Sequence, residues 1–250
     1  MVEEYPVYFA RFYDLIYHHL RDGDDSRFYF EKIMNTSGSV LEAGSGTGRL
    51  LTEALENGAD IYGIDVSPAM LAILRAKLSP ENQKRISLQN IVDFRLDKKF
   101  DLIIAPFRVL MHLTEKEDQM KALDNVYDHL NNKGLFIFDV FVPALKPLIS
   151  GLENVTDFEG EFEPGNSVRR VVSTKPDLIN QIINITFRLE WNEGGTNFTR
   201  EWETPLRYIF RFELEHLIER SKFRTYTIEG DFAGSALSND SKEFVVTCIK

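Results

Sequence analysis

The chain has 250 residues, of which 43% are hydrophobic, and this suits one large domain or a core domain with an insertion. No apolar run approaches the roughly 20 residues of a membrane helix, and the acidic start at residues 1–6 lacks the order of a secretory signal, so we expect a cytoplasmic protein with no membrane partner. The formal net charge of -10 argues against extended binding to nucleic acid, and the lone Cys248 excludes an intramolecular disulfide and a multi-cysteine zinc site, so no metal is expected.

Residues 7–20 are predicted to form a helix rich in aromatic residues. Apolar or aromatic side chains recur at positions 9, 12, 13, 16, 17 and 20, which is the spacing of one helical face. The acidic run at 22–25 interrupts this pattern, and a second helix is expected from residue 26 to about residue 34. Tyr13 and Tyr17 either pack in the core or belong to a helix that folds over a bound ligand, and the pattern leaves both interpretations open.

The stretch from Val40 to Leu51, VLEAGSGTGRLL, is the one around which the chain is organised. We interpret it as the end of a buried strand, a glycine-rich turn and the first turn of a helix, whose unpaired N–H groups and partial positive charge would face a ligand. Gly44 would allow the tight turn, Gly46 would let a ligand touch the backbone, and Gly48 would let the helix pack close to the sheet. The alternative is a strand-to-helix turn without a ligand.

The spacing of these glycines differs from that of a dinucleotide-binding loop, because Arg49 stands where the third glycine would fall. An acidic residue, Glu42, lies two places before the first glycine. This arrangement resembles motif I of the Rossmann-like (class I) methyltransferases that depend on S-adenosylmethionine (SAM). The resemblance implies SAM as the cofactor and S-adenosylhomocysteine (SAH) as its product. A carboxylate at this strand end would suit the ammonium group of the SAM methionine moiety and would sit badly beside a pyrophosphate.

A second strand over 61–64 is predicted to end at Asp65, about 20 residues beyond the glycines. An acid at the tip of the neighbouring strand can accept hydrogen bonds from both ribose hydroxyls, and the resemblance implies this role for Asp65, with Val66 beside it. The pair Ser67-Pro68 is typical of a helix start, and Met70 falls on the apolar face of that helix. An isolated aspartate at a strand end is otherwise often a turn residue.

A third strand over 86–89 leads into Asn90 and Ile91. In the methyltransferase family an acidic residue commonly stands near this position and reads the adenine amino group. Here the side-chain carbonyl of Asn90 can accept the same hydrogen bond, so we favour Asn90 with the backbone of Ile91 over the neighbouring Asp93.

Residues 100–105 are predicted to form a central parallel strand that is buried on both faces. Active-site groups collect at the carboxyl edge of such a sheet, which would place Ala105, Pro106 and Phe107 beside the SAM sulfonium. His112 is either a general base or a helix-start residue with a backbone partner. The Asn/Asp-Pro-Pro-Tyr motif of enzymes that methylate base amino groups is absent, which further disfavours a nucleic-acid acceptor.

Between about residues 142 and 211 the period of the sequence changes to two, and apolar residues alternate with polar ones. Turn signals at 163–166, 175–177 and 192–195 separate three or four antiparallel strands. This insertion is predicted to be either a lid that shapes the acceptor pocket or a structural or dimerising sheet.

The remaining core elements follow from the same patterns. They are a helix over 115–131 that ends in Asn131–Gly134, a fifth strand over 135–140, a helix over 212–220, and two closing strands over 225–228 and 243–249, one of them antiparallel. The expected fold is therefore α/β, a Rossmann-like seven-stranded and mostly parallel sheet with helices on both faces, plus a small inserted antiparallel β-lid. Residues 1–141 and 212–250 would form the SAM-binding core, and residues 142–211 the insertion.

Three further residues lie at the return from the insertion to the core. Arg207, Tyr208 and Arg211 would hold an anionic acceptor there, or would instead form solvated ion pairs with the many acids. The candidates for a catalytic role are then Tyr13, Tyr17, His112, Arg207, Tyr208 and Arg211. The expected cofactor-binding residues are Tyr13, Glu42, Ala43, Gly44, Ser45, Gly46, Asp65, Val66, Met70, Asn90, Ile91, Ala105, Pro106 and Phe107.

The family resemblance implies an enzyme that moves the SAM methyl group by SN2 displacement to an N or O atom of a small-molecule acceptor. Because the leaving group is already activated, the protein has mainly to align the reactants and exclude water, which explains why no catalytic triad stands out. Two alternatives remain, namely a methyltransferase acting on protein or RNA, and a scaffold that binds SAM without turnover. A homodimer is left open as the state of assembly.

Overall fold

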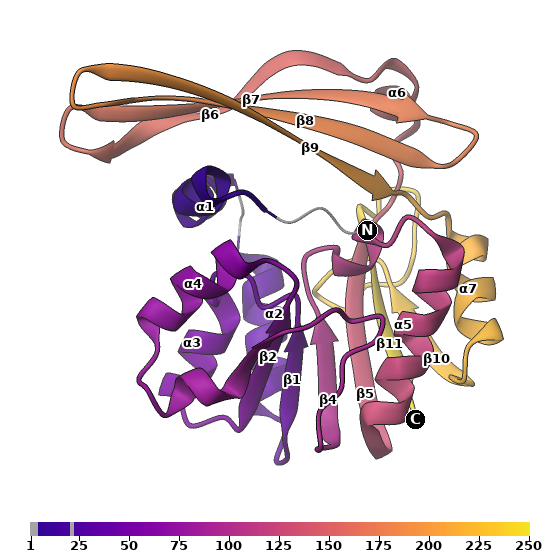
Figure 1. Cartoon of the computed structure of the whole chain (residues 1–250). Helices are drawn as coiled ribbons and strands as arrows, with labels where there is room; N and C mark the ends of the chain where they lie inside the picture. The colour runs from indigo at the N-terminus through magenta and orange to yellow at the C-terminus, as the bar shows by residue number, and fades with distance from the viewer. Residues whose placement is uncertain (1–4, 21–22) are drawn as a thin grey trace.

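The computed structural model describes residues 5–20 and 23–250, so residues 1–4 and 21–22, the second pair including the first residue of the acidic run at 22–25, lie outside the described residues. The described chain forms an α/β core with a four-stranded antiparallel sheet stacked over one end of it (Figure 1). Helix α1 (Val7–Leu20) lies between these two layers, directly under the four-stranded sheet (Figure 1).

The core sheet has seven strands in the order β10-β11-β5-β4-β1-β2-β3. Its strands are β1 (Val40–Ala43), β2 (Ile61–Asp65), β3 (Ile86–Leu88), β4 (Phe100–Ala105), β5 (Leu130–Phe141), β10 (Thr225–Glu229) and β11 (Glu243–Ile249). The pairs among β1 to β5 are parallel, whereas β11 is antiparallel to both of its neighbours. This arrangement confirms the predicted Rossmann-like fold class.

Helices cover both faces of this sheet, because each carries an apolar stripe that the strands bury. On one face lie α2 (Asp24–Met34), α3 (Arg49–Glu56) and α4 (Pro68–Lys77), and on the other lie α5 (Lys116–His129) and α7 (Arg211–Arg220). Two short 3-10 turns, η1 (Asn82–Arg85) and η2 (Val109–His112), precede β3 and α5. Within the described part of the chain, no helix combines the length and apolar character needed to cross a bilayer.

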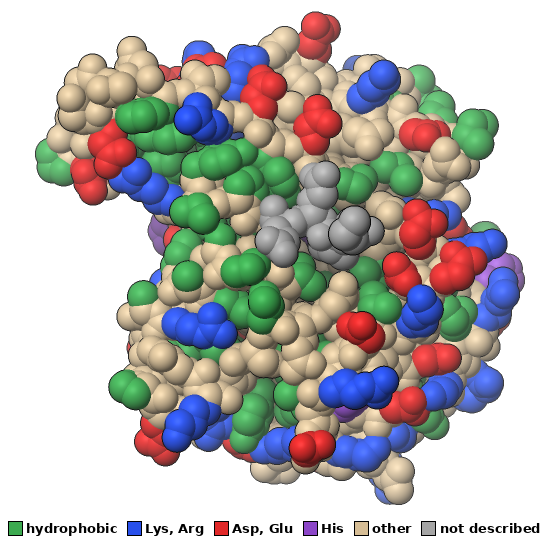
Figure 2. Space-filling model, viewed as in Figure 1, with side chains coloured by type: hydrophobic (Ala, Val, Ile, Leu, Met, Phe, Trp, Pro, Cys, Tyr) green, Lys and Arg blue, Asp and Glu red, His purple; other side chains and the backbone are tan. Residues whose placement is uncertain are grey.

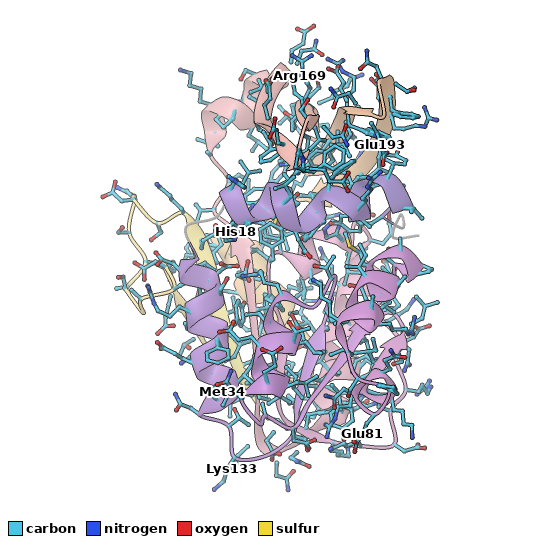
Figure 3. The ribbon with its side chains drawn as sticks, turned by 90° about the vertical axis from the view of Figure 1, so that its left-hand side faces the viewer. His18, Met34, Glu81, Lys133, Arg169 and Glu193 are labelled. Atoms are coloured by element: carbon cyan, nitrogen blue, oxygen red, sulfur yellow. The ribbon has the colours of Figure 1, made fainter. Side chains whose placement is uncertain are left out.

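The segment that interrupts the core forms a separate sheet, which we call the inserted sheet. It consists of the antiparallel strands β6 (Leu152–Glu163), β7 (Asn166–Asp177), β8 (Ile182–Glu193) and β9 (Thr196–Arg207), with the short helix α6 (Leu145–Ser150) before them. Its face toward the core is largely apolar, and its underside meets α1 (Figure 3). Hydrophobic side chains also gather along the junction of the two layers in Figure 2.

One expected turn and one expected helix end are wrong. The segment 175–177 belongs to β7, where Pro176 pairs with Ile183, and the turn lies beyond it at 178–181. Thr174 is the last residue of β7 that pairs with β6, so Pro176 stands at an edge position, where a missing N–H is tolerated. Residues 131–134 do not end the preceding helix, which stops at His129. They lie in β5, where Lys133 and Gly134 exchange backbone hydrogen bonds with the C-terminal Lys250.

Helix α1 is joined to the two layers in different ways. Its buried residues Phe9, Phe12 and Ile16 share an apolar cluster with side chains of the inserted sheet, among them Leu189 and Trp202. It also contacts the core through polar groups: Asp14 accepts hydrogen bonds from Thr47 (2.5 Å) and Lys77 (2.7 Å). The helix therefore packs against the inserted sheet. The hydrogen bonds of Asp14 to Thr47 and Lys77, which we call the latch, hold it to the core.

Candidate active site

Two adjoining cavities open at the carboxyl edge of the core sheet. The glycine-loop cavity, of about 110 Å³, is lined by Gly44, Ser45, Gly46 and Thr47 together with the residues that follow β2, β3 and β4. The large cavity, of about 680 Å³, lies between the ends of β5 and β11 and the underside of the inserted sheet. Tyr5, Phe107 and His112 line both cavities, so these three residues form their common wall.

The glycine loop adopts a backbone that other residues rarely tolerate. Gly44, Gly46 and Gly48 have φ values of 77°, 54° and 87°, in the left-handed region. A Cβ atom on Gly44 would clash with Val109, and one on Gly48 would clash with Leu74 of α4, so the close neighbour of Gly48 is a helix and not the sheet. In front of Gly46, by contrast, no described residue beyond its two chain neighbours has an atom within 4 Å of the Cβ position, which leaves room for a ligand to reach the backbone.

Glu42, at the end of β1, is a buried acid that lacks a partner for one oxygen. Its side chain lines the glycine-loop cavity, the residue is 3% exposed, and Oε2 has no hydrogen-bond partner among the described residues. Burial raises the pKa of Glu42 to about 8, and the nearby carboxylate of Asp65 adds to this, whereas Arg49 opposes it. A cation bound in the cavity would supply the missing partner, so this residue fits the ammonium group of SAM.

Asp65 ends β2 and ties the glycine loop to the next turn. Its carboxylate accepts hydrogen bonds from the backbone N–H groups of Gly46 (2.7 Å) and Ser67 (2.8 Å). Burial raises its pKa, and these backbone hydrogen bonds oppose the rise. Ser67 in turn caps α4 by accepting from Met70 N–H (3.2 Å). The loop, the acid and the helix start are thus held as one unit, with oxygen lone pairs of Asp65 left for a ribose.

Most of the expected cofactor-binding residues line the glycine-loop cavity. They are Tyr13, Glu42, Gly44, Ser45, Gly46, Asp65, Val66, Met70, Asn90, Ile91, Pro106 and Phe107. Ala43 and Ala105 do not, because both are fully buried and pack in the core cluster beneath the strand ends. Asn90 already accepts a hydrogen bond from Val92 N–H through Oδ1 (3.0 Å), so one lone pair of that oxygen remains for an adenine amino group.

His112 stands where the two cavities meet. It lies at the end of η2 and lines both cavities, with its ring centroid 6.2 Å from that of Tyr5. Burial lowers the pKa of His112 to about 4, so the ring is neutral at pH 7 and can accept a proton. The role of His112 as a general base stays a prediction.

Both tyrosines of α1 face the site. Tyr13 lines the glycine-loop cavity and Tyr17 lines the large cavity, with ring centroids 4.4 Å apart. Both tyrosines also pack against the apolar cluster that contains Phe9 and Phe12, and the rings of Phe9 and Tyr13 lie 6.4 Å apart. The helix therefore packs in an apolar core, and its role in covering a ligand stays a prediction.

The three candidate residues at the return from the insertion lie outside both cavities. Arg207 donates to the carbonyl of Thr114 (2.7 Å), Tyr208 is buried in the core cluster, and Arg211 pairs with Glu215 on the exposed side of α7. None of the three lines either cavity, and they are withdrawn as acceptor-binding candidates. Near the end of β9, Thr204 and Leu206 line the large cavity, whereas Arg207 is bonded to Thr114 instead.

The basic residue that does reach the large cavity from the inserted sheet is Arg170, which the sequence did not single out. It lies on β7, is 2% exposed, and forms a bidentate ion pair with Asp157 (3.0 and 2.7 Å). Its Nη1 has no hydrogen-bond partner among the described residues. The only sequence signal was an arginine on the inward face of an otherwise apolar alternation. No group of three or more metal-binding side chains occurs in the described ranges.

Comparisons with known proteins agree with this geometry. Residues 41–136 match a family described as a methyltransferase domain. A glycine/sarcosine N-methyltransferase from Parasynechococcus marenigrum is 27% identical over 211 residues, which cover 82% of this chain and 70% of the relative.

Among solved structures, a SAM-dependent methyltransferase from Clostridium acetobutylicum superposes with a TM-score of 0.77 at 20% identity, covering 96% of this chain and 97% of the other. A sugar N-methyltransferase from a Streptoalloteichus species gives a TM-score of 0.74 at 16% identity, covering 95% and 92%. At these identities the two structures share the fold with this chain.

Proposed function

We propose that this chain, which belongs to the Rossmann-like (class I) SAM-dependent methyltransferases, transfers the methyl group of SAM to a small molecule. The methyl group would go to an N or O atom of an acceptor held in the large cavity. The observation that carries the proposal is the wall of Tyr5, Phe107 and His112, which both cavities share. A donor in one cavity and an acceptor in the other would meet at this wall.

The glycine-loop cavity is the proposed site of SAM. Glu42 would hold the ammonium group, the bare backbone at Gly46 would contact the cofactor, and Asp65 would bind the ribose hydroxyls. Asn90 and Ile91 would receive the adenine at the end of β3. The unpartnered oxygen of Glu42 and the open space before Gly46 support this assignment. SAM supplies a methyl group on a sulfonium, which is an activated leaving group.

The protein's own part in the transfer is alignment and proton removal. The inserted sheet and α1 cover the large cavity and would exclude water from it. Phe107 and Tyr17, whose rings lie 5.4 Å apart, form an aromatic wall against which an acceptor can be oriented. The neutral imidazole of His112 would take the proton that an amine or hydroxyl loses as it is methylated.

The chemistry of the large cavity favours an amine that carries oxygen groups. Asp139 and Glu243 contribute acidic oxygens, and Arg108 and Arg170 contribute guanidinium groups. The unpartnered Nη1 of Arg170 would complete its hydrogen bonds with a carboxylate or hydroxyl of the acceptor. The relatives named for glycine, sarcosine and sugar N-methylation support nitrogen as the atom that is methylated.

A panel assay tests this proposal. The purified chain is first titrated with SAM by calorimetry and is then incubated with SAM and glycine, sarcosine or glucosamine, with product detected by mass spectrometry. We expect SAM binding and N-methylation of at least one of these acceptors. Binding without product from this panel, or methylation of added protein or RNA instead, would overturn it.

Acidic and basic side chains are interspersed on the face shown in Figure 2, so this face lacks the continuous basic surface that a polyanion such as RNA binds.

A further inference from the structure

We propose that Asp139 is a positioning residue for methyl transfer, because its carboxylate holds the turn of Phe107 and Arg108 that builds the wall between the two cavities. The proposal deepens the function proposed above and rests on it. Asp139 lies near the end of β5, lines the large cavity, and is 2% exposed.

Three hydrogen bonds converge on this carboxylate. Oδ1 accepts from the hydroxyl of Tyr29 on α2 (2.7 Å) and from Phe107 N–H (2.8 Å), and Oδ2 accepts from Arg108 N–H (3.2 Å). Two successive backbone N–H groups thus point at one buried anion, which is the arrangement of an anion-binding nest. The carboxylate reaches this turn from a different strand, so the contact is one of tertiary structure.

The turn itself is strained and needs such an anchor. Phe107 and Arg108 have φ values of 57° and 67°, which side chains other than glycine rarely adopt, and here two such residues follow one another. Strained backbone of this kind persists only where its surroundings hold it, and it is concentrated at functional sites. Without the bonds to Asp139, the two residues would relax toward ordinary backbone angles.

The anchored turn fixes the parts of the site that matter for transfer. The carbonyl of Arg108 accepts from Met111 N–H (2.9 Å), which starts η2 and so places His112. Val109, the next residue, packs against Gly44 of the glycine loop. Phe107 forms part of the common wall. A shift of this turn would therefore move the wall and His112 together, relative to the donor.

The charge state of Asp139 adds a pH readout. Burial raises its pKa to about 6, the hydrogen bond from Tyr29 lowers it, and the neighbouring Glu243 of β11 raises it. The backbone N–H of Phe107 and the charge of Arg108 also lower it, and Arg108 is itself paired with Glu243 at 2.8 Å. Protonation turns one accepting oxygen into a donor, so the bond to one backbone N–H is lost below about pH 6.

Four proteins test the proposal, namely the wild type, Asp139→Asn, Tyr29→Phe and the control Asp60→Asn. In Asp139→Asn the amide oxygen can keep the bonds to Tyr29 and Phe107, but the amide nitrogen then faces Arg108 N–H. Asp60 lies just before β2, at the amino ends of the parallel strands, where it accepts hydrogen bonds from Ser39, Arg85 and Lys98. The measurements are hydrogen exchange of residues 106–113 with SAH bound, SAM affinity, and kcat with whichever of glycine, sarcosine or glucosamine the wild type methylates.

For Asp139→Asn we expect faster exchange at 106–113, SAM affinity close to the wild type, and kcat lower by about 100-fold, since a small misplacement of reacting groups has this effect. Tyr29→Phe should keep the turn and move the acid limb of the kcat profile to higher pH, because it removes a bond that lowers the pKa of Asp139. Asp60→Asn should change neither exchange at 106–113 nor the profile.

Unchanged exchange and kcat in Asp139→Asn would overturn the proposal, as would a Tyr29→Phe profile identical to the wild type. Methylation of none of the three acceptors by the wild type is a failure of the proposed function instead. The exchange measurement still decides whether Asp139 holds the turn in that case, because it requires no acceptor.

Discussion

At the scale of single residues, the candidate site depends on two acids at neighbouring strand ends and on the glycine between them. Asp65 has two tasks in this arrangement, because it holds Gly46 N–H at 2.7 Å and presents its remaining lone pairs to the cavity. Glu42 has one proposed role, which is to pair with a cationic ligand, since its Oε2 has no hydrogen-bond partner among the described residues. The two acids should therefore respond differently to substitution.

Replacing Asp65 by alanine should abolish measurable SAM binding. The change removes the ribose acceptor and also releases the glycine loop, while the strand β2 keeps its pairs with β1 and β3. Calorimetry measures the affinity, and far-ultraviolet circular dichroism serves as the control for folding. Normal SAM affinity in a folded Asp65→Ala protein would show that the ribose site is assigned wrongly.

Replacing Glu42 by glutamine should remove a proton release that accompanies SAM binding. With a pKa of about 8, the buried carboxyl is mostly protonated at pH 7, and an ammonium group beside it favours the ionised form. Calorimetry in two buffers of different ionisation enthalpy counts the protons released by the wild type. The glutamine variant should release none and bind SAM about 10- to 100-fold more weakly, as loss of a charged hydrogen bond implies.

The same acid gives the unbound protein a pH-dependent stability. Its folded pKa lies above the ordinary value of 4.5, so its favourable contribution is present below about pH 4.5 and is lost as the pH rises toward 8. Glu42→Gln should flatten this part of the stability curve. Equal proton release and equal pH slopes in the two proteins would contradict the assignment of Glu42.

His112→Gln should separate chemistry from cofactor binding. Loss of the neutral imidazole at the common wall should lower kcat by about 100-fold or more, the usual range for a general base, while SAM affinity stays close to the wild type. Steady-state kinetics at saturating acceptor, together with calorimetry, measure the two effects. An unchanged kcat would mean that His112 serves only as part of the wall.

At the scale of elements, α1 connects the inserted sheet with the glycine loop. Its apolar side belongs to the cluster of the inserted sheet, and Asp14 latches it to the core through Thr47 and Lys77. An ion pair as exposed as that of Asp14 and Lys77 adds little to stability, so breaking it should change the opening of α1 more than the folding of the chain.

Asp14→Ala should therefore speed the release of SAH without a marked fall in melting temperature. Arg11→Ala is the matched control, because Arg11 lies on the same helix and pairs with Glu193 of the inserted sheet, away from the glycine loop. Stopped-flow fluorescence of SAH release measures both variants. Equal release rates in Asp14→Ala and Arg11→Ala would show that the latch does not govern access.

Elements with a strong local pattern were predictable from the sequence. Helix α1 has the expected bounds, and the alternation after residue 142 gave antiparallel strands. The expectations at Pro176 and at 131–134 failed because segments distant in the sequence determine both. Pro176 is tolerated in a strand because β7 has no β6 neighbour beyond Thr174, and residues 131–134 are extended because Lys133 pairs with Lys250. Local propensity cannot register such pairings.

At the scale of the whole molecule, the SAM-binding half of the candidate site was visible in the sequence and the acceptor half was not. Glu42 and Gly46 lie in the glycine motif after β1, and Asp65 ends the adjacent strand β2, so chain order nearly determines their positions. The large cavity instead joins Arg170 from the inserted sheet with Asp139 from the core. Which face of a strand points into it depends on the twist and docking of the inserted sheet, which the alternation does not specify.

The proposed function depends above all on the wall that the two cavities share, and a crystal structure with SAH bound tests it most directly. We expect the adenosine beyond Asp65, the amino group against Glu42, and the sulfur facing Phe107 and His112 toward the large cavity. A glycine-loop cavity that stays empty at saturating SAH, or a sulfur that points away from the large cavity, would contradict the account.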